Sequence, residues 1–292
     1  MDAPLRPRRS VLFLPGSNPR ALDKARTLAA DGLIFDLEDA VAPAAKEAAR
    51  ASVAAALQTG GYAPRELILR INSLDGAWGD ADLATAATLP IDAVLLPKVE
   101  SAATVRLASD RLDALRAPSG LVLWCMIETP LGVLAAAEIA ASSPRVAALV
   151  AGTSDLTTNL HARDTRDRRP LLTALGLVLL AARAHRRAVL DGVQLDLDDT
   201  ESFAAACRQG RELGFDGKTL IHPTQIAPAN AAFAPSGEEV ARARHIITAY
   251  TEAAEAGTGA VRIDGRLVEA LHVEEARRIL ALAEAITARK DG

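Results

Sequence analysis

The sequence predicts an α/β fold, specifically a (β/α)8 TIM barrel followed by a C-terminal extension. Eight short apolar runs rich in Val, Leu and Ile alternate with Ala-rich stretches that have helical spacing. Hydrophobic residues make up 50% of the chain but aromatic residues only 3%, which is typical of parallel strands buried on both faces. Eight strands indicate a barrel, because a doubly wound sheet usually has about five or six. At 292 residues the chain can hold one barrel and an appendage.

The apolar runs give the predicted strands in chain order. They are "SVLFLPG", "GLIFDLED", "LILRINS", "AVLLPKVES", "LVLWCMIET", "VAALVAGTSD", "AVLDGVQLDL" and "GKTLIHP". The segments between them, such as "NPRALDKARTLAA" and "DTESFAAACRQGRELG", place apolar residues at helical spacing and have Gly, Asp or Asn at their edges. Residues 1–232 are therefore predicted to form the barrel.

The pattern changes in residues 233–292. A helix is predicted over 240–255, followed by the Gly-rich loop "AGTGA" and a hairpin "VRIDGRLV", whose Asp-Gly suits a tight turn. A last helix is predicted to end near Arg289. This extension is too short and too polar to form a domain alone. We therefore expect it to pack on a neighbouring subunit of a homo-oligomer.

Composition and charge argue against several classes of function. The net charge of −4, with no stretch that interleaves aromatic and basic residues, predicts no nucleic-acid partner. Cys125 and Cys207 lie in apolar or helical contexts without metal-ligand spacing, which predicts reduced thiols and a cytoplasmic location. The early apolar run "VLFLP" stops at Pro15 and Gly16, too short for a signal sequence or a membrane span. No membrane association is expected.

Polar side chains follow the predicted strands at their C-terminal ends, where barrels of this type have their active sites. "LVLWCMI" is followed by Glu128, and a carboxylate without partners is costly to bury. Asp155 follows the next strand, so the two acids should point across one mouth, where they must share a proton or a cation. Two carboxylates with positions left for water and substrate suit Mg²⁺. Other strand ends bear Asp36, Glu38, Asp39, Arg70, Asn72, Lys98, Glu100 and His222.

Several segments resemble the signatures of the HpcH/HpaI aldolase superfamily. They are "RSVLFLPGSNPRALDKA", "GLIFDLEDAVAPAAKEAAR", "LRINS", "AVLLPKVES", "MIETPLGV", "GTSDL", "GFDGKTLIHPTQI" and "GAVRIDGRLV". The similarity spans nearly the whole chain and points to the branch of the citrate lyase β subunit and the malyl-CoA and citramalyl-CoA lyases. It implies an oligomer, a trimer or a hexamer, that cleaves or forms a carbon–carbon bond in β-hydroxyacyl thioesters with Mg²⁺.

The resemblance also implies roles for individual residues. Glu128 and Asp155 match the metal ligands of the family, and Arg70 matches its substrate-binding arginine; Glu128 is expected to reach the substrate as well. Where related lyases have "G-[KR]-M-[IV]-D", this chain reads "GRLVE". Glu269 therefore replaces the catalytic aspartate that the family presents from a neighbouring subunit.

The chemistry of thioester cleavage predicts further roles. It needs a base, an electrophile and a group that stabilises developing negative charge. The planar, permanently charged guanidinium of Arg70 suits an enolate oxygen or a carboxylate. Glu38 is expected to orient a metal-bound water or Arg70. Arg20 and Lys24, at the start of the first helix, are expected to bind the phosphates of CoA.

Each site residue also has a structural interpretation. Glu128 or Asp155, taken alone, could be an ion-pair partner or a helix cap, and Arg70 could form a salt bridge inside the mouth. Arg20 and Lys24 could lie on a solvated helix face. Asp36 and Asp39 are expected to cap the second helix rather than to perform chemistry.

Several functions stay open at this point. The leading one is an acyl-CoA lyase acting on a malyl-CoA or citramalyl-CoA type of thioester, which would release acetyl-CoA and a 2-oxo acid by retro-Claisen cleavage. One alternative is a citrate lyase β subunit acting on a carrier-protein thioester. Another is a malyl-CoA thioesterase, and the last is a non-catalytic metal- or acid-binding homologue.

Overall fold

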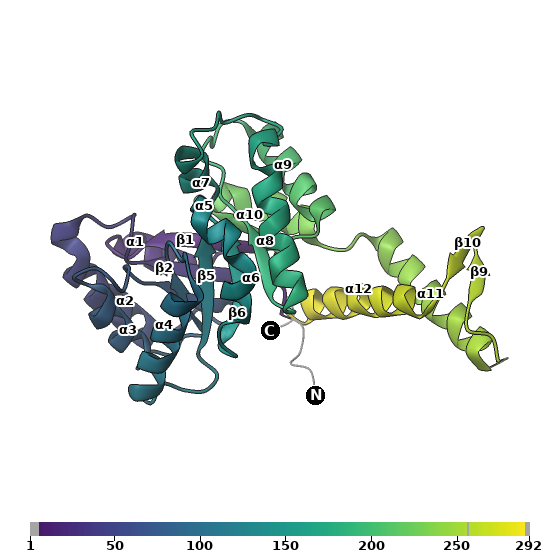
Figure 1. Cartoon of the computed structure of the whole chain (residues 1–292), viewed down its shortest axis with the longest axis horizontal. Helices are drawn as coiled ribbons and strands as arrows, with labels where there is room; N and C mark the ends of the chain where they lie inside the picture. The colour runs from purple at the N-terminus through teal and green to yellow at the C-terminus, as the bar shows by residue number, and fades with distance from the viewer. Residues whose placement is uncertain (1–5, 256, 290–292) are drawn as a thin grey trace. The chain divides into compact units, whose positions relative to one another are not determined.

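A computed structural model describes residues 6–255 and 257–289 (Figure 1). The chain divides into two compact units, residues 8–233 and the segment from residue 234 onward together with the N-terminal residues before 8. The larger unit is a closed barrel in which the strands follow one another in chain order, from β1 to β8. This confirms the predicted (β/α)8 fold.

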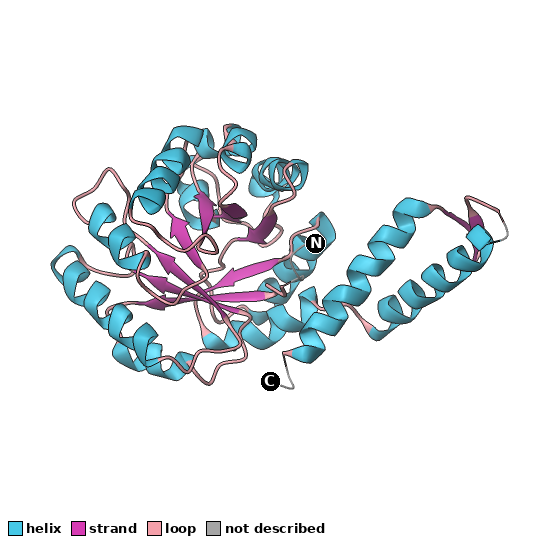
Figure 2. Ribbon diagram, turned by 90° about the horizontal axis from the view of Figure 1, so that it is seen from below, coloured by secondary structure: helices cyan, strands magenta, loops and turns pink. Residues whose placement is uncertain are grey.

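The barrel strands are short and lie inside a ring of helices (Figure 2). Every neighbouring pair is parallel, and the pairing of β1 with both β2 and β8 closes the barrel. The strands are β1 (Ser10–Pro15), β2 (Gly32–Asp36), β3 (Glu66–Arg70), β4 (Ala93–Leu96), β5 (Val122–Ile127), β6 (Val146–Ala151), β7 (Ala188–Asp191) and β8 (Gly217–Leu220).

The helices of this unit lie between successive strands or follow β8. Side chains of Asn18, Ser101, Thr129 and Asp199 accept hydrogen bonds from the first turns of α1, α4, α5 and α9, which fixes where those helices begin. The α-helices are α1 (Pro19–Ala25), α2 (Lys46–Thr59), α3 (Gly79–Ala86), α4 (Ala102–Ala114), α5 (Pro130–Leu134), α6 (Ala136–Ala141), α7 (Thr153–Asn159), α8 (Leu172–Ala184), α9 (Thr200–Leu213) and α10 (Ile226–Phe233). Single 3-10 turns are Pro43–Ala45, Arg169–Leu171 and Pro223–Gln225.

Aliphatic side chains fill the barrel on both sides of its wall. A large buried cluster lies between strands and helices, and a smaller one includes Val11, Ile68, Trp124, Met126 and Val150 from alternate strand positions. Because side chains alternate along a strand, β1 to β7 contribute to both clusters, whereas β8 contributes Leu220 to the larger one. The aliphatic residues that dominate the sequence thus pack on both faces of the strands.

One buried ionic cluster lies at the end of β7. Asp191 accepts hydrogen bonds from the Lys218 ammonium at 2.8 Å and from Nη1 of Arg168 at 2.8 and 2.7 Å. Burial alone would raise the pKa of Asp191, but the charges of Lys218 and Arg168 outweigh it and lower that pKa. Burial also lowers the pKa of Lys218, on which Asp191 and Arg168 act in opposite directions. The two neighbouring cations therefore keep Asp191 ionised in spite of its burial.

The C-terminal unit is a helix, a hairpin and a second helix. Its elements are α11 (Gly237–Glu255), β9 (Val261–Ile263), β10 (Arg266–Val268) and α12 (Ala270–Ala288), and α11 packs against α12. Asp264 and Gly265 have φ angles of 47° and 77°, as an Asp-Gly hairpin turn requires. The helix predicted from residue 240 begins earlier because Ser236 and Glu239 cap each other reciprocally. None of the described helices is long and apolar enough to cross a membrane.

Candidate active site

A cavity of about 370 Å³ opens at the C-terminal ends of the barrel strands. Three of the predicted site residues, Arg70, Glu128 and Asp155, line it together with Asp36 and Asp39. Its remaining lining comes from Phe13, Pro15, Ala40, Met126, Ala151, Gly152, Thr153, Ser154, Val193 and Ile221. The strands therefore bring acids, one arginine and several apolar side chains to one opening.

Glu128 directly follows β5 and is only 2% exposed. Its Oε1 accepts a hydrogen bond of 2.7 Å from the main-chain N–H of Lys98. Burial, together with the neighbouring acids Asp155 and Glu38, raises the pKa of Glu128 to about 8 despite that bond. The surroundings of Glu128 therefore have too little positive charge to balance an ionised carboxylate, and a bound cation would supply it.

Gly152 makes room for Glu128. A Cβ atom at residue 152 would lie 2.3 Å from Cβ and 2.7 Å from Oε2 of Glu128. Those distances are far below normal van der Waals separations, so only glycine fits between β6 and α7 with Glu128 in this place.

Asp155 lies in the first turn of α7, beside Glu128, with its side chain 36% exposed. The Lys98 ammonium is 3.9 Å from its Oδ2. Among the described residues, no group of three or more His, Cys, Asp or Glu side chains could by itself hold a metal ion. Glu128 and Asp155 could supply two anionic oxygen ligands, which fits Mg²⁺, because this ion commonly keeps water or substrate in its other positions.

Arg70 ends β3 and is 6% exposed. Its Nε and Nη2 donate to the two carboxylate oxygens of Asp36 at 2.7 and 2.6 Å, and its Nη1 lies 2.9 Å from Oε2 of Glu38. Burial opposes the charge, but Asp36, Glu38 and Asp39 raise the pKa of Arg70 above its usual value. The guanidinium is therefore always charged and partly engaged by the protein itself.

The expectation that Asp36 caps the second helix is wrong. Helix α2 begins at Lys46 after Ala45, with no side-chain cap. Asp36 instead binds Arg70, because the two residues are register partners at the ends of β2 and β3. Asp39, also expected at that cap, lies 3.4 Å from the Lys98 ammonium.

Glu38 and Lys98 connect the Glu128–Asp155 pair with the Arg70–Asp36 pair. Glu38 is 8% exposed, and its Oε1 accepts a 2.5 Å hydrogen bond from the Lys98 ammonium. Burial, together with the neighbouring Asp39, raises the pKa of Glu38 more than Arg70 and Lys98 lower it. Burial lowers the pKa of Lys98, but Glu38, Asp39 and Glu128 more than offset this and raise it. Sequence reasoning noted Lys98 only as a polar strand end and missed its contacts.

The other predicted site residues are placed differently. Arg20 and Lys24 are both exposed on α1, but only Arg20 lies at its start; Lys24, also expected there, is in the last turn because α1 ends at Ala25. Glu269 belongs to the C-terminal unit, where it is exposed immediately before α12, and its main-chain N–H donates to Nδ1 of His272 at 3.1 Å. Leu267 and Leu271, on either side of it, are 61% and 62% exposed.

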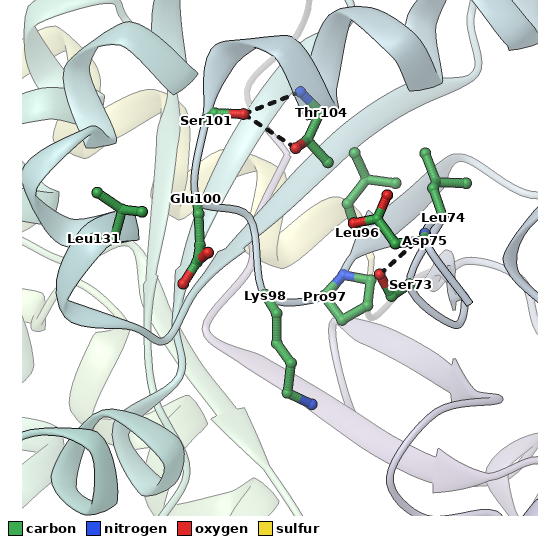
Figure 3. A pocket seen from close by; sticks show the side chains of 10 residues that line it. All are labelled: Ser73, Leu74, Asp75, Leu96, Pro97, Lys98, Glu100, Ser101, Thr104 and Leu131. Atoms are coloured by element: carbon green, nitrogen blue, oxygen red, sulfur yellow. Dashed lines mark hydrogen bonds between the residues drawn. The ribbon is translucent and has the colours of Figure 1, made fainter.

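A second cavity, of about 260 Å³, lies beside the β4–α4 loop (Figure 3). Its lining is Ser73, Leu74, Asp75, Leu96, Pro97, Lys98, Glu100, Ser101, Thr104 and Leu131. Lys98 lines this cavity as well as contacting Glu38 and Glu128 of the site.

A barrel whose acids and arginine meet at the C-terminal mouth is the arrangement of a TIM-barrel enzyme site. The family model described as HpcH/HpaI aldolase/citrate lyase matches residues 9–223. The chain belongs to this family, which confirms the resemblance noted in the sequence.

Individual relatives cover almost the whole chain. A (3S)-malyl-CoA thioesterase of Cereibacter sphaeroides is 49% identical over 282 residues, which are 97% of this chain and 96% of the relative. A citrate lyase subunit beta of Leuconostoc mesenteroides subsp. cremoris is 38% identical over 283 residues, 95% of this chain and 94% of the relative.

Solved structures give the same family relationship. CitE from Mycobacterium tuberculosis in complex with magnesium, acetoacetate and coenzyme A has a TM-score of 0.77 and 32% identity, covering 96% of this chain and 100% of that one. The citrate lyase beta subunit from the same organism, complexed with oxaloacetate and magnesium, has a TM-score of 0.68 and 33% identity, covering 78% of this chain and 98% of that one.

Proposed function

We propose that the protein is a Mg²⁺-dependent thioesterase that hydrolyses a β-hydroxyacyl-CoA of the malyl-CoA type. The observation that carries the proposal is the Glu128–Asp155 pair beside Arg70, in a chain 49% identical to a (3S)-malyl-CoA thioesterase over nearly its full length. The sequence alone favoured the lyase and left the thioesterase as an alternative. The similarity to the thioesterase reverses that order.

The site residues have separate tasks in such a reaction. Mg²⁺ bound by Glu128 and Asp155 would supply a Lewis acid that polarises a substrate oxygen. Arg70 places a fixed positive charge at the cavity wall for the acyl carboxylate or for the oxygen that gains charge as water attacks. Glu38 holds Nη1 of Arg70, so it positions that charge.

Hydrolysis forms a bond between the water oxygen and the thioester carbon and breaks the carbon–sulfur bond. The proton lost by the water must be accepted by a base, and the departing thiolate must be protonated. We assign this proton transfer to Glu269 of another copy of the chain. Support comes from its exposed carboxylate and from Leu267 and Leu271, whose exposed apolar surface suits burial against a second copy.

The variants Glu269→Gln and Glu269→Asp test this assignment. Gln cannot accept a proton, so turnover should be lost while Mg²⁺ affinity, measured by calorimetry, stays at the wild-type value. Asp should retain turnover. Light scattering should show an oligomer, for which a trimer or a hexamer is proposed. Wild-type turnover in the Gln variant would place the proton transfer elsewhere.

Arg20 and Lys24 are proposed to bind the phosphates of CoA. The double variant Arg20→Met/Lys24→Met should raise KM for a CoA thioester but leave KM for the same acyl group on N-acetylcysteamine, which has no phosphate, unchanged. An equal effect on both substrates would refute the assignment.

A carbon–carbon lyase is the second candidate, favoured by the family and by the 38% identity to a citrate lyase subunit beta. The test incubates the purified chain with a panel of hydroxyacyl-CoA thioesters and Mg²⁺, with a chelator control. Mass spectrometry should show free CoA and the hydroxy acid. Acetyl-CoA with a 2-oxo acid would support the lyase, and the absence of turnover on CoA thioesters but turnover on a carrier-protein thioester would support a citrate lyase β subunit.

A further inference from the structure

Lys98 forms hydrogen bonds with two carboxylates of the site and lies near two more. Its main-chain N–H donates to Oε1 of Glu128 at 2.7 Å, and its ammonium donates to Oε1 of Glu38 at 2.5 Å. The same ammonium lies 3.4 Å from Asp39 and 3.9 Å from Asp155. One residue therefore joins the expected metal-binding pair to the acid that holds Arg70.

The backbone of Lys98 is in an unusual conformation. Its φ angle is 47°, in the left-handed region that residues other than glycine rarely adopt. This conformation lets the N–H of Lys98 reach Glu128 while its side chain extends to Glu38. Figure 3 shows the side chain extending away from Ser101, which caps α4, and from Thr104 within that helix. Strain of this kind persists where the surrounding contacts determine it, and it is common at functional sites.

The charges around Lys98 are unevenly compensated. Asp36 is bound through both oxygens by Arg70, and Glu38 lies between Arg70 and Lys98. Oδ2 of Asp155 lies 3.9 Å from the Lys98 ammonium, which is the nearest positive charge to it among the described residues. A bound cation and the Lys98 ammonium would therefore repel each other while sharing the same acids.

We infer that Lys98 is a positioning residue of the reaction, which sets the places of Glu128 and Glu38 relative to each other and lowers the affinity of the acid pair for Mg²⁺. The inference rests on the proposed function. Loss of a purely structural residue would weaken folding, metal binding and turnover together. Loss of the Lys98 ammonium should instead strengthen Mg²⁺ binding and lower turnover.

The test compares Lys98→Met with Lys98→Arg, which keeps the positive charge. In the Met variant Mg²⁺ should bind more tightly, on the order of tenfold, because a partly screened positive charge about 4 Å from a ligand is gone. Its kcat should fall about a hundredfold, as expected for a misplaced Glu38 and Arg70, with a smaller change in KM. The Arg variant should keep the wild-type Mg²⁺ affinity and recover part of kcat.

Lys46→Met is the structural comparison. Lys46 is buried, and its ammonium donates to the main-chain oxygens of Leu37 and Glu38 at 2.9 and 2.6 Å rather than to carboxylates. Its loss should lower the melting temperature without tightening Mg²⁺ binding. Wild-type kcat in Lys98→Met, or weaker Mg²⁺ binding together with a lower melting temperature, would overturn the inference. If the wild-type chain itself binds no Mg²⁺, the proposed function fails and the inference fails with it.

Discussion

Replacing Gly152 by alanine perturbs the site without removing any functional group. The added Cβ would lie 2.3 Å from Cβ and 2.7 Å from Oε2 of Glu128. Carbon atoms in contact are normally about 3.5–4.0 Å apart, so Glu128 or the β6–α7 connection must shift by about 1 Å or more. A misplacement of about 1 Å can lower a rate by on the order of a hundredfold. The variant should therefore lose about two orders of magnitude in kcat/KM and bind Mg²⁺ more weakly.

Gly176→Ala is the matched control. Gly176 lies within α8, and an added Cβ there would meet nothing within 4 Å. Alanine is favoured over glycine inside a helix by about 0.5–1 kcal/mol, so this variant should be slightly more stable and fully active. Gly152→Ala should instead lose about 1–3 kcal/mol, as overpacked sites do.

The assays are calorimetry with Mg²⁺, thioester hydrolysis followed by the release of free thiol, and urea unfolding. Measuring all three separates a displaced Glu128 from an unfolded chain. Wild-type Mg²⁺ affinity and turnover in folded Gly152→Ala would refute the reasoning, because Glu128 would then tolerate a displacement that the proposed site cannot accept.

Three further predictions concern single side chains. Glu128→Gln should weaken Mg²⁺ binding strongly, since a neutral amide replaces one of two anionic ligands; unchanged affinity by calorimetry would remove Glu128 from the metal site. Arg70→Lys keeps the charge but loses the two-point contact with buried Asp36, so kcat/KM should fall by orders of magnitude and the free energy of unfolding by about 1–3 kcal/mol; full activity of the folded variant would make Arg70 structural only. The pKa of Asp191 is lower in the folded state than its unfolded value of about 3.9, so its ion pairs stabilise the fold fully above that value. This contribution is lost as the pH falls through the folded pKa. The stability advantage of wild type over Asp191→Asn, about 3–5 kcal/mol at neutral pH, should therefore shrink as the pH falls below about 4 in urea unfolding, and a constant difference would contradict the ion-pair account.

The fold could be predicted from the sequence because each strand is a short aliphatic run and each run ends in polar residues. That rule also predicts that Arg70, Glu128 and Asp155 share the barrel mouth, and the structure places all three around one cavity. The hairpin turn at Asp264 and Gly265 was predictable for a local reason, since Asp-Gly favours the positive φ angles found there.

The partners of these residues could not be predicted by the same rule. Asp36 was expected at a helix cap, but it faces Arg70 because the register of β2 and β3 places the two opposite each other. Lys98 reaches Glu128 through its main chain at a positive φ angle, which no side-chain pattern signals. The role of Gly152 depends on a distance to Glu128, which only coordinates provide.

The most direct test of the proposed function is the reaction of (3S)-malyl-CoA with the purified chain and Mg²⁺ in water labelled with heavy oxygen. Hydrolysis of the thioester must place one labelled oxygen in the carboxyl group of the released hydroxy acid and set free unacylated CoA. The account predicts labelled malate and free CoA, with no product when Mg²⁺ is chelated. Acetyl-CoA with glyoxylate as the main products would contradict it and show that the chain cleaves the carbon–carbon bond instead.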